Sequence, residues 1–266
     1  MTRPPVTLQD ADRILEKTVS FPTQGAVFER LEPITDFRKD DDEARIVYLC
    51  RKVQQEGLEP VESGLFILKC KVQCAQSIPS PPLSCLLTIH PRAPSQLAGG
   101  LTTPIAGPSK YTVSEIEALR LFADKQAPSV PHLIAWKTAV QGSDGLMPDG
   151  YIAYTVMTLL SGNHLMDLKF WSMDDAEKEE IRTAFPVVLK SVWQLGIDPY
   201  DCALRNVMWD QKRRVLSLVD FEHWRPNEKD PVNMTEREEL IKWGLQHSPP
   251  HAFHWQAFFA AETQLH

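Results

Sequence analysis

The sequence predicts an α+β fold, formed by one large domain or by two closely joined lobes. Strand patterns dominate the first part of the chain, at 46–53, 65–72 and 151–160. A long helical pattern over 172–195 and a short hairpin over 207–219 follow. The 266 residues are 43% hydrophobic and 24% charged, which excludes a wholly disordered chain.

Charge and composition exclude several classes of partner. The formal net charge is −7, so nucleic acid is not an expected partner. No run of about 20 apolar residues is present, so we expect no membrane span, and the first residues lack the apolar segment of a secretory signal. An odd number of irregularly spaced cysteines indicates free thiols and a cytoplasmic protein. The cysteines are Cys50, Cys70, Cys74, Cys85 and Cys202.

Residues 1–36 combine a short helical stretch over 8–17 with turn signals. A charged, solvated turn over 38–45 and a strand over 46–53 follow. A turn over 57–64 then leads to a second strand, 65–72, with the sequence LFILKCKV. This strand alternates in character. One face holds Phe66, Leu68, Cys70 and Val72, and the other holds Ile67, Lys69 and Lys71.

The segment 73–110 differs in kind, because it contains seven prolines and almost no charge. We interpret it as an irregular insertion. A helix follows from Thr112, with Thr112 or Ser114 as its cap. Its apolar stripe consists of Ile116, Leu119 and Phe122.

In the second half, residues 151–160 form a long apolar strand. Ser172 then begins a helix, with Asp175 three residues later as in a capping box. Pro186 is expected to kink this helix, and Gly196 to end it. Two short helices, 236–246 and 253–262, complete the chain.

The segment GIDPYDCALRNVMWDQKRRVLSLVDFEHW, residues 196–224, carries the candidate chemistry. Asn206 precedes the first strand of the hairpin and Asp220 follows the second, so the two lie close together. Their oxygen atoms suit a hard cation such as Mg²⁺. Asp201, on the loop leading in, is placed to accept a proton from a substrate hydroxyl.

The pattern D-x-x-x-x-N, a short hairpin and then D-F resembles the protein-kinase-like superfamily. The form VDFE is similar to the choline kinases, the aminoglycoside phosphotransferases and, above all, short fungal protein-kinase-like proteins. The resemblance implies a two-lobed fold, with a small antiparallel N-lobe that contains one helix and a mostly helical, shortened C-lobe. It also implies that Asp201 is the catalytic base and that Asn206 and Asp220 bind Mg²⁺.

The upstream chain matches the superfamily in linear order, over roughly residues 45–225. The resemblance implies that Lys69, with Lys71 as the alternative, binds the phosphates of ATP. It implies that Glu115, or Glu117 in the alternative register, pairs with that lysine. The segment from Thr158 to Leu160 would lie beside the adenine. The resemblance places the N-lobe at 1–160, with the insertion at 73–110, and the C-lobe at 161–266.

Three departures from the superfamily pattern are present. Pro199 stands where a histidine is usual, no glycine-rich loop precedes Lys69, and only 44 residues follow Glu222. Several of the candidate residues also have simpler structural interpretations. Asp201 can cap a turn, Lys69 can be a surface lysine that extends its amine into water, and Glu115 can be a solvated helix residue. Arg205 either binds a phosphate or forms a salt bridge within its loop.

The function expected from these features is the transfer of the γ-phosphoryl group of ATP to a hydroxyl-bearing acceptor, with Mg²⁺. The acceptor is expected to be a small molecule rather than a protein. The alternative is a pseudokinase, which binds a nucleotide or a protein partner without turnover. A third possibility is a purely structural protein that binds no nucleotide.

Overall fold

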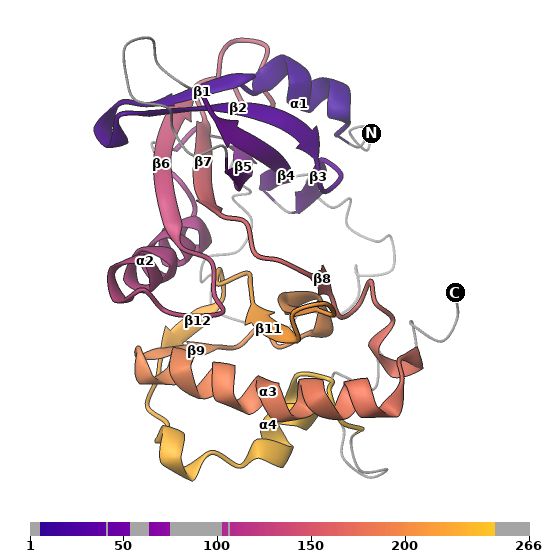
Figure 1. Cartoon of the computed structure of the whole chain (residues 1–266). Helices are drawn as coiled ribbons and strands as arrows, with labels where there is room; N and C mark the ends of the chain where they lie inside the picture. Colours follow the sequence, from indigo (N-terminus) through magenta and orange to yellow (C-terminus); the bar gives the residue numbers. More distant parts are fainter. Residues whose placement is uncertain (1–5, 41, 54–63, 75–102, 106, 248–266) are drawn as a thin grey trace, which may run out of the picture. The chain divides into compact units, whose positions relative to one another are not determined.

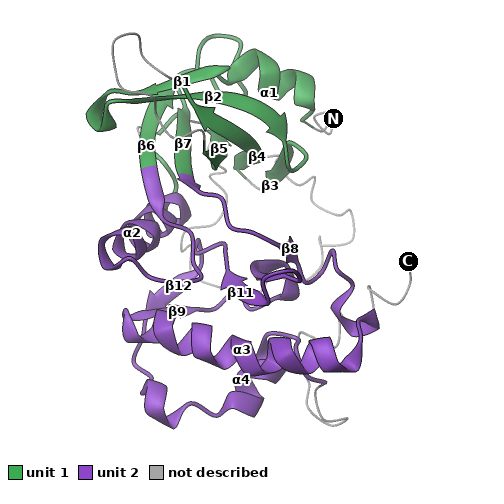
Figure 2. Cartoon of the chain, in the orientation of Figure 1, with its two compact units in different colours: residues 1–109, 135–156 green, residues 110–134, 157–266 purple. Residues whose placement is uncertain are grey.

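A computed structural model describes residues 6–40, 42–53, 64–74, 103–105 and 107–247. Its fold is mixed α/β, with an antiparallel, strand-rich N-terminal part and few helices, which is compatible with a kinase-like fold. The chain divides into two compact units (Figure 2). Unit 1 comprises residues 1–109 and 135–156, and unit 2 comprises residues 110–134 and 157–266.

Unit 1 is built on a seven-stranded sheet with the order β1-β2-β4-β5-β7-β6, in which β3 pairs with β4 (Figure 1). Helix α1 (Leu8–Ile14) precedes the sheet and begins with a capping box formed by Thr7 and Asp10. The strands are β1 (Thr18–Phe21), β2 (Ala26–Pro33), β3 (Arg38–Asp40), β4 (Glu43–Lys52), β5 (Leu65–Gln73), β6 (Leu133–Val140) and β7 (Tyr151–Thr158).

Strand β5 confirms the predicted alternation. Leu68, Cys70 and Val72 are fully buried in the core of unit 1, and Phe66 packs against them. The opposite face is also buried, since Lys71 is only 2% exposed. Strand β5 lies in the middle of the sheet, between β4 and β7, and its second face is buried although it carries Lys69 and Lys71.

The N-terminal strands were not predicted. We expected turns between the first helix and residue 36, but β1 and β2 form an antiparallel hairpin there. Gly25, with φ +58°, ends the connecting turn. We also expected a solvated turn over 38–45, whereas β3 pairs with the start of β4. The charged residues at that point lie on a sheet edge, where side chains can reach water without breaking the ladder.

Unit 2 contains three α-helices among its described residues, α2 (Lys110–Lys125), α3 (Asp175–Gln194) and α4 (Glu236–Lys242). Short strands form two small sheets, β11-β10-β8 and β12-β9. We had expected a mostly helical C-lobe, but the described part of unit 2 is not mostly helical. These strands are β8 (Asn163–His164), β9 (Ile197–Pro199), β10 (Val207–Asp210), β11 (Val215–Leu218) and β12 (Trp224–Pro226). Single turns of 3₁₀-helix lie at Phe170–Ser172, Leu204–Asn206 and Pro231–Asn233.

Two predicted helix starts were wrong. Helix α3 is capped by Asp174, whose side chain accepts a hydrogen bond from the amide of Ala176 at 2.9 Å, while Ser172 lies in a separate 3₁₀ turn. Helix α2 begins at Lys110, so Thr112 lies inside the helix and is buried. Both errors arise because Ser and Thr residues fit either a cap or the first turn.

The remaining helix predictions have mixed outcomes. Helix α3 runs on through Pro186, and Gly196, with φ +82°, follows its last turn as predicted. The helix expected over 236–246 is α4, which is shorter at its C-terminal end. The helix expected over 253–262 and most of the insertion lie outside the described residues.

The four cysteines within the described residues are free thiols, as predicted. Across the described ranges, no helix combines the length and the apolar character that crossing a membrane requires. The predicted lobe boundary after residue 160 stays a prediction. The compact units group residues 110–134 with the C-terminal part of the chain.

Candidate active site

The β10–β11 hairpin places the ends of its two strands together, as predicted. Val207 pairs with Leu218 at the open end of the ladder. One step further, the amide of Val219 donates to the carbonyl oxygen of Asn206 at 3.0 Å. Since Asp220 follows directly, the hairpin brings Asp220 close to Asn206.

Asp201 lies in a loop that folds back on itself. One carboxylate oxygen, Oδ1, lies 2.6 Å from Nη2 of Arg205. The other, Oδ2, accepts a hydrogen bond from Nδ2 of Asn206 at 3.1 Å. The Asp201 side chain is 30% exposed. It is therefore a fixed, partly solvated carboxylate, and Arg205 forms the salt bridge that was one of its two expected roles.

Asn206 is buried, and both of its amide hydrogens are directed at Asp201. Nδ2 donates to the Asp201 carbonyl oxygen at 2.8 Å as well as to its carboxylate. The remaining polar atom of the side chain is the amide oxygen, which is the atom that binds hard cations. The residue thus links the candidate base to the candidate metal ligands.

Three acidic side chains converge in unit 2. Carboxylate oxygens of Glu115, Asp220 and Glu222 all lie within 4.8 Å of one another. Glu115 and Glu222 are buried, and Asp220 is partly buried. Three carboxylates this close repel one another, and a divalent cation would offset that repulsion. The donor set therefore fits a hard cation such as Mg²⁺.

Packing between helix α2 and the segment after β11 produces this convergence. Asp220 has φ +63°, a left-handed conformation that aspartate tolerates better than most residues. The next residue, Phe221, is buried, and its ring lies 4.6 Å from the ring of Phe122 in α2. Glu115 lies two helical turns before Phe122, on the same face. The Phe122–Phe221 contact therefore directs Glu115 toward Asp220 and Glu222.

A second contact holds the start of α2. Nε1 of Trp224 donates to the carbonyl oxygen of Ser114 at 2.9 Å, and the ring of His223 lies 4.6 Å from that of Tyr111. Residues 221, 223 and 224 thus all contact α2. Glu115 is consequently a buried residue of the site and not a solvated helix residue.

The two candidate lysines lie in unit 1, on the same face of β5. Lys71 forms an ion pair with Glu43, with 3.3 Å between Nζ and Oε2, and Tyr151 donates a hydrogen bond to the same carboxylate at 2.7 Å. Lys69 is 9% exposed, so it is not a surface lysine. The pairing of Lys69 with Glu115 stays a prediction.

The predicted adenine-binding segment lies at the end of β7. The hydroxyl oxygen of Thr158 accepts a hydrogen bond from the amide of His132 at 2.9 Å, and the Thr158 amide donates to the His132 carbonyl oxygen at 3.0 Å. These bonds fix the backbone at Thr158. A role for Thr158 and Leu160 in adenine binding stays a prediction.

Two further groups, Cys202 and His247, have structural roles. Cys202 follows Asp201 directly, and burial raises the pKa of its thiol to about 12, so it is protonated at neutral pH. The thiol donates to the carbonyl oxygen of Pro199 at 3.5 Å. His247 stacks on Trp171 with ring centres 3.9 Å apart.

Sequence reasoning did not assign Glu222 to the site. The available signal was its spacing from Asp220. Phe221, between the two acids, is buried against Phe122. The carboxylates of Asp220 and Glu222, on either side of it, lie within 4.8 Å of each other.

No protein-family model matches the chain, and no curated protein matches it. Among solved structures, the chain is similar to the kinase PK-1 of the Cydia pomonella granulovirus. The TM-score is 0.43 and the sequence identity is 16%. The match covers 75% of this chain and 52% of the viral kinase, so the chain spans about half the length of that protein.

Proposed function

We propose that the protein is an ATP- and Mg²⁺-dependent phosphotransferase that moves the γ-phosphoryl group of ATP to a hydroxyl group. The observation that carries this proposal is the arrangement of Asp201, Asn206 and Asp220 on two loops joined by the bond between Val219 and Asn206. A candidate base thus lies next to two oxygen ligands for a cation. Phosphoryl transfer requires little more than such positioning and charge stabilisation.

Each residue has a separate task in this reaction. Asp201 orients the acceptor hydroxyl and takes its proton. Arg205 must release one oxygen of Asp201 for this step, because it now holds that carboxylate at 2.6 Å. Asn206 and Asp220 would hold Mg²⁺, with Glu115 and Glu222 close by. Bound Mg²⁺ offsets the negative charge that develops on the phosphate oxygens.

Lys69 is assigned to the phosphates of ATP from its match to the superfamily pattern, and the alternative, Lys71, forms an ion pair with Glu43. Thr158 and Leu160 are assigned to the adenine on the strength of the sequence resemblance. The same resemblance, through the form VDFE, favours a small-molecule acceptor over a protein. ATP and this acceptor are the partners that we propose.

Turnover separates this proposal from the pseudokinase alternative. The substitution Asp201→Asn removes the base and keeps one of the two acceptor oxygens, so we expect phosphotransfer to fall about 10²- to 10⁴-fold with MgATP still bound. The measurement is ATP consumption with a panel of hydroxyl-bearing small molecules. A wild type no faster than Asp201→Asn across the whole panel, with nucleotide still bound, would establish a pseudokinase.

One observation favours that alternative. Both carboxylate oxygens of Asp201 are engaged within its own loop, by Arg205 and Asn206, and Pro199 stands where a histidine is usual in the superfamily. A module that only binds nucleotide has no need of a free base. The presence of Asn206 and Asp220 together with Asp201 favours the enzyme.

A further inference from the structure

Two short strands join the parts of the chain that carry the candidate catalytic groups. We call residues 200–206 the base loop and residues 219–223 the metal turn. Strand β9 ends directly before the base loop, and β12 begins directly after the metal turn. The two strands pair in antiparallel fashion, with Asp198 opposite Arg225.

The base loop and the metal turn are bonded together at both of their ends. At one end, the amide of Tyr200 donates to the carbonyl oxygen of His223 at 3.0 Å, which extends the β9–β12 ladder. At the other end lies the 3.0 Å bond between Val219 and Asn206. The positions of the two segments relative to each other therefore depend on both connections.

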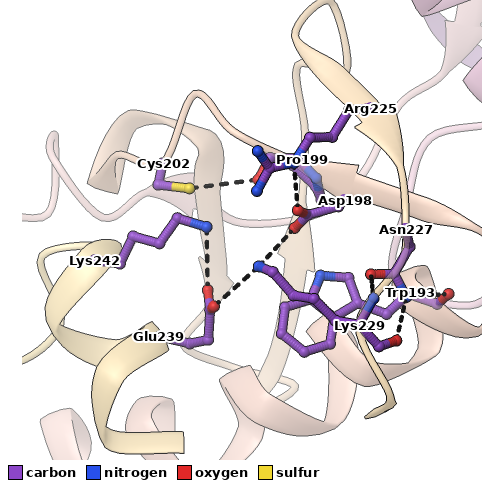
Figure 3. A network of polar contacts seen from close by, with 9 residues as sticks. All are labelled: Trp193, Asp198, Pro199, Cys202, Arg225, Asn227, Lys229, Glu239 and Lys242. Atoms are coloured by element: carbon purple, nitrogen blue, oxygen red, sulfur yellow. Dashed lines mark hydrogen bonds and ion pairs between the residues drawn. The ribbon is translucent and has the colours of Figure 1, made fainter. Parts of the chain in front are cut away.

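The β9–β12 ladder is weak by itself. Each strand has three residues and ends in a proline, which cannot donate a backbone hydrogen bond. The side chain of Asp198 supplies support across the ladder (Figure 3). It is 2% exposed and accepts bonds from Nε of Arg225 at 2.8 Å and from Nζ of Lys229 at 3.1 Å.

The same group of charges reaches both neighbouring helices (Figure 3). Nζ of Lys229 also lies 3.2 Å from Oε1 of Glu239 in α4 and 4.4 Å from the ring centre of Trp193 in α3. Nζ of Lys242 lies 3.4 Å from the other oxygen of Glu239. Burial disfavours the charged form of Asp198, but its bonds to Arg225 and Lys229 outweigh this and lower its pKa. Asp198 is therefore ionised at neutral pH.

We propose that Asp198 is a positioning residue of the candidate active site. Together with Arg225 it holds β9 against β12, and so it sets the spacing between the base loop, which carries Asn206, and the metal turn, which carries Asp220. This inference rests on the proposed function, since it assumes that these two residues bind Mg²⁺ jointly with ATP. Asp198 itself is not one of the candidate metal ligands.

The test is isothermal titration of the full chain with ATP, once with Mg²⁺ and once with EDTA. The ratio of the two dissociation constants measures how far Mg²⁺ strengthens ATP binding. We expect Asp198→Asn and Arg225→Gln to reduce this ratio at least fivefold, and Arg225→Lys to reduce it less. Arg225 is 59% exposed in its side chain, so Arg225→Gln provides a folded variant if Asp198→Asn does not fold.

Ile181→Val is the matched control. It removes one methyl group from the buried face of α3, outside the charged group, and so lowers stability without touching the ladder. We expect its ratio to equal that of the wild type. A reduced ratio in this control, or an unchanged ratio in both Asp198→Asn and Arg225→Gln, would overturn the positioning role alone. A wild type whose ATP affinity does not depend on Mg²⁺ would overturn the proposed function, and this inference with it.

Discussion

At the scale of single residues, the candidate site shows which of its contacts can be predicted from the sequence. The spacing of Asp201, Asn206 and Asp220 around a hairpin was sufficient to predict that the last two are neighbours, because a hairpin imposes that geometry locally. The inclusion of Glu115 was not predictable in this way. It depends on the contact between Phe122 and Phe221, which are far apart in the sequence.

Asp198 gives a prediction for stability against pH. Its pKa is lowered in the folded protein, so its ionised form stabilises the fold above the unfolded-state pKa of about 3.9. This stabilising free energy is lost as the pH falls through the lower pKa of Asp198 in the folded protein. We expect Asp198→Asn to cost about 2 kcal/mol at pH 7.

The measurement is urea unfolding of wild type and Asp198→Asn between pH 3 and 7. The difference in unfolding free energy should narrow below about pH 4, as the wild-type carboxylate becomes protonated. A difference that stays constant down to pH 3 would contradict an ionised Asp198.

At the scale of elements, β4, β5, β7 and the β10–β11 hairpin were predicted, whereas β1, β2, β3 and β6 were not. Strand β4 alternates in burial over most of its length, and β5 places Leu68, Cys70 and Val72 on one face in the core, so both carry a clear strand pattern in the sequence. Strands β1 and β6 lack that length or regularity, and their pairing partners determine them. Helix α3 was predicted, but its cap was misplaced.

The cap of α3 can be tested with a pair of neighbouring substitutions. Asp174→Ala removes the acceptor of the Ala176 amide, so we expect a loss of about 1 kcal/mol in the free energy of unfolding. Ser172→Ala lies outside the helix and is expected to change it by less than about 0.5 kcal/mol. Chemical unfolding of both variants gives the comparison. Equal losses, or a larger loss for Ser172→Ala, would mean that the helix begins at Ser172.

At the scale of the whole molecule, the proposed function depends on nucleotide and metal binding together. In the proposed function, the acidic group in unit 2 would supply ligands for Mg²⁺, and its charge would repel the phosphates of free ATP. ATP is therefore expected to bind well only when Mg²⁺ offsets the charge of the acidic group and that of the phosphates. Strong dependence on Mg²⁺ distinguishes this account from a protein that binds nucleotides by apolar contacts alone.

The most direct test is thermal unfolding with ATP, with and without Mg²⁺, for wild type, Asp220→Ala and the control Asp167→Ala, which changes an exposed turn residue. Ligand at about 100 times its dissociation constant adds about 2.7 kcal/mol, or roughly 5–10 °C for a chain near this size. We predict a Mg²⁺-dependent shift of that size in wild type and in Asp167→Ala, and its loss in Asp220→Ala. No shift in folded wild type at millimolar MgATP would contradict the account.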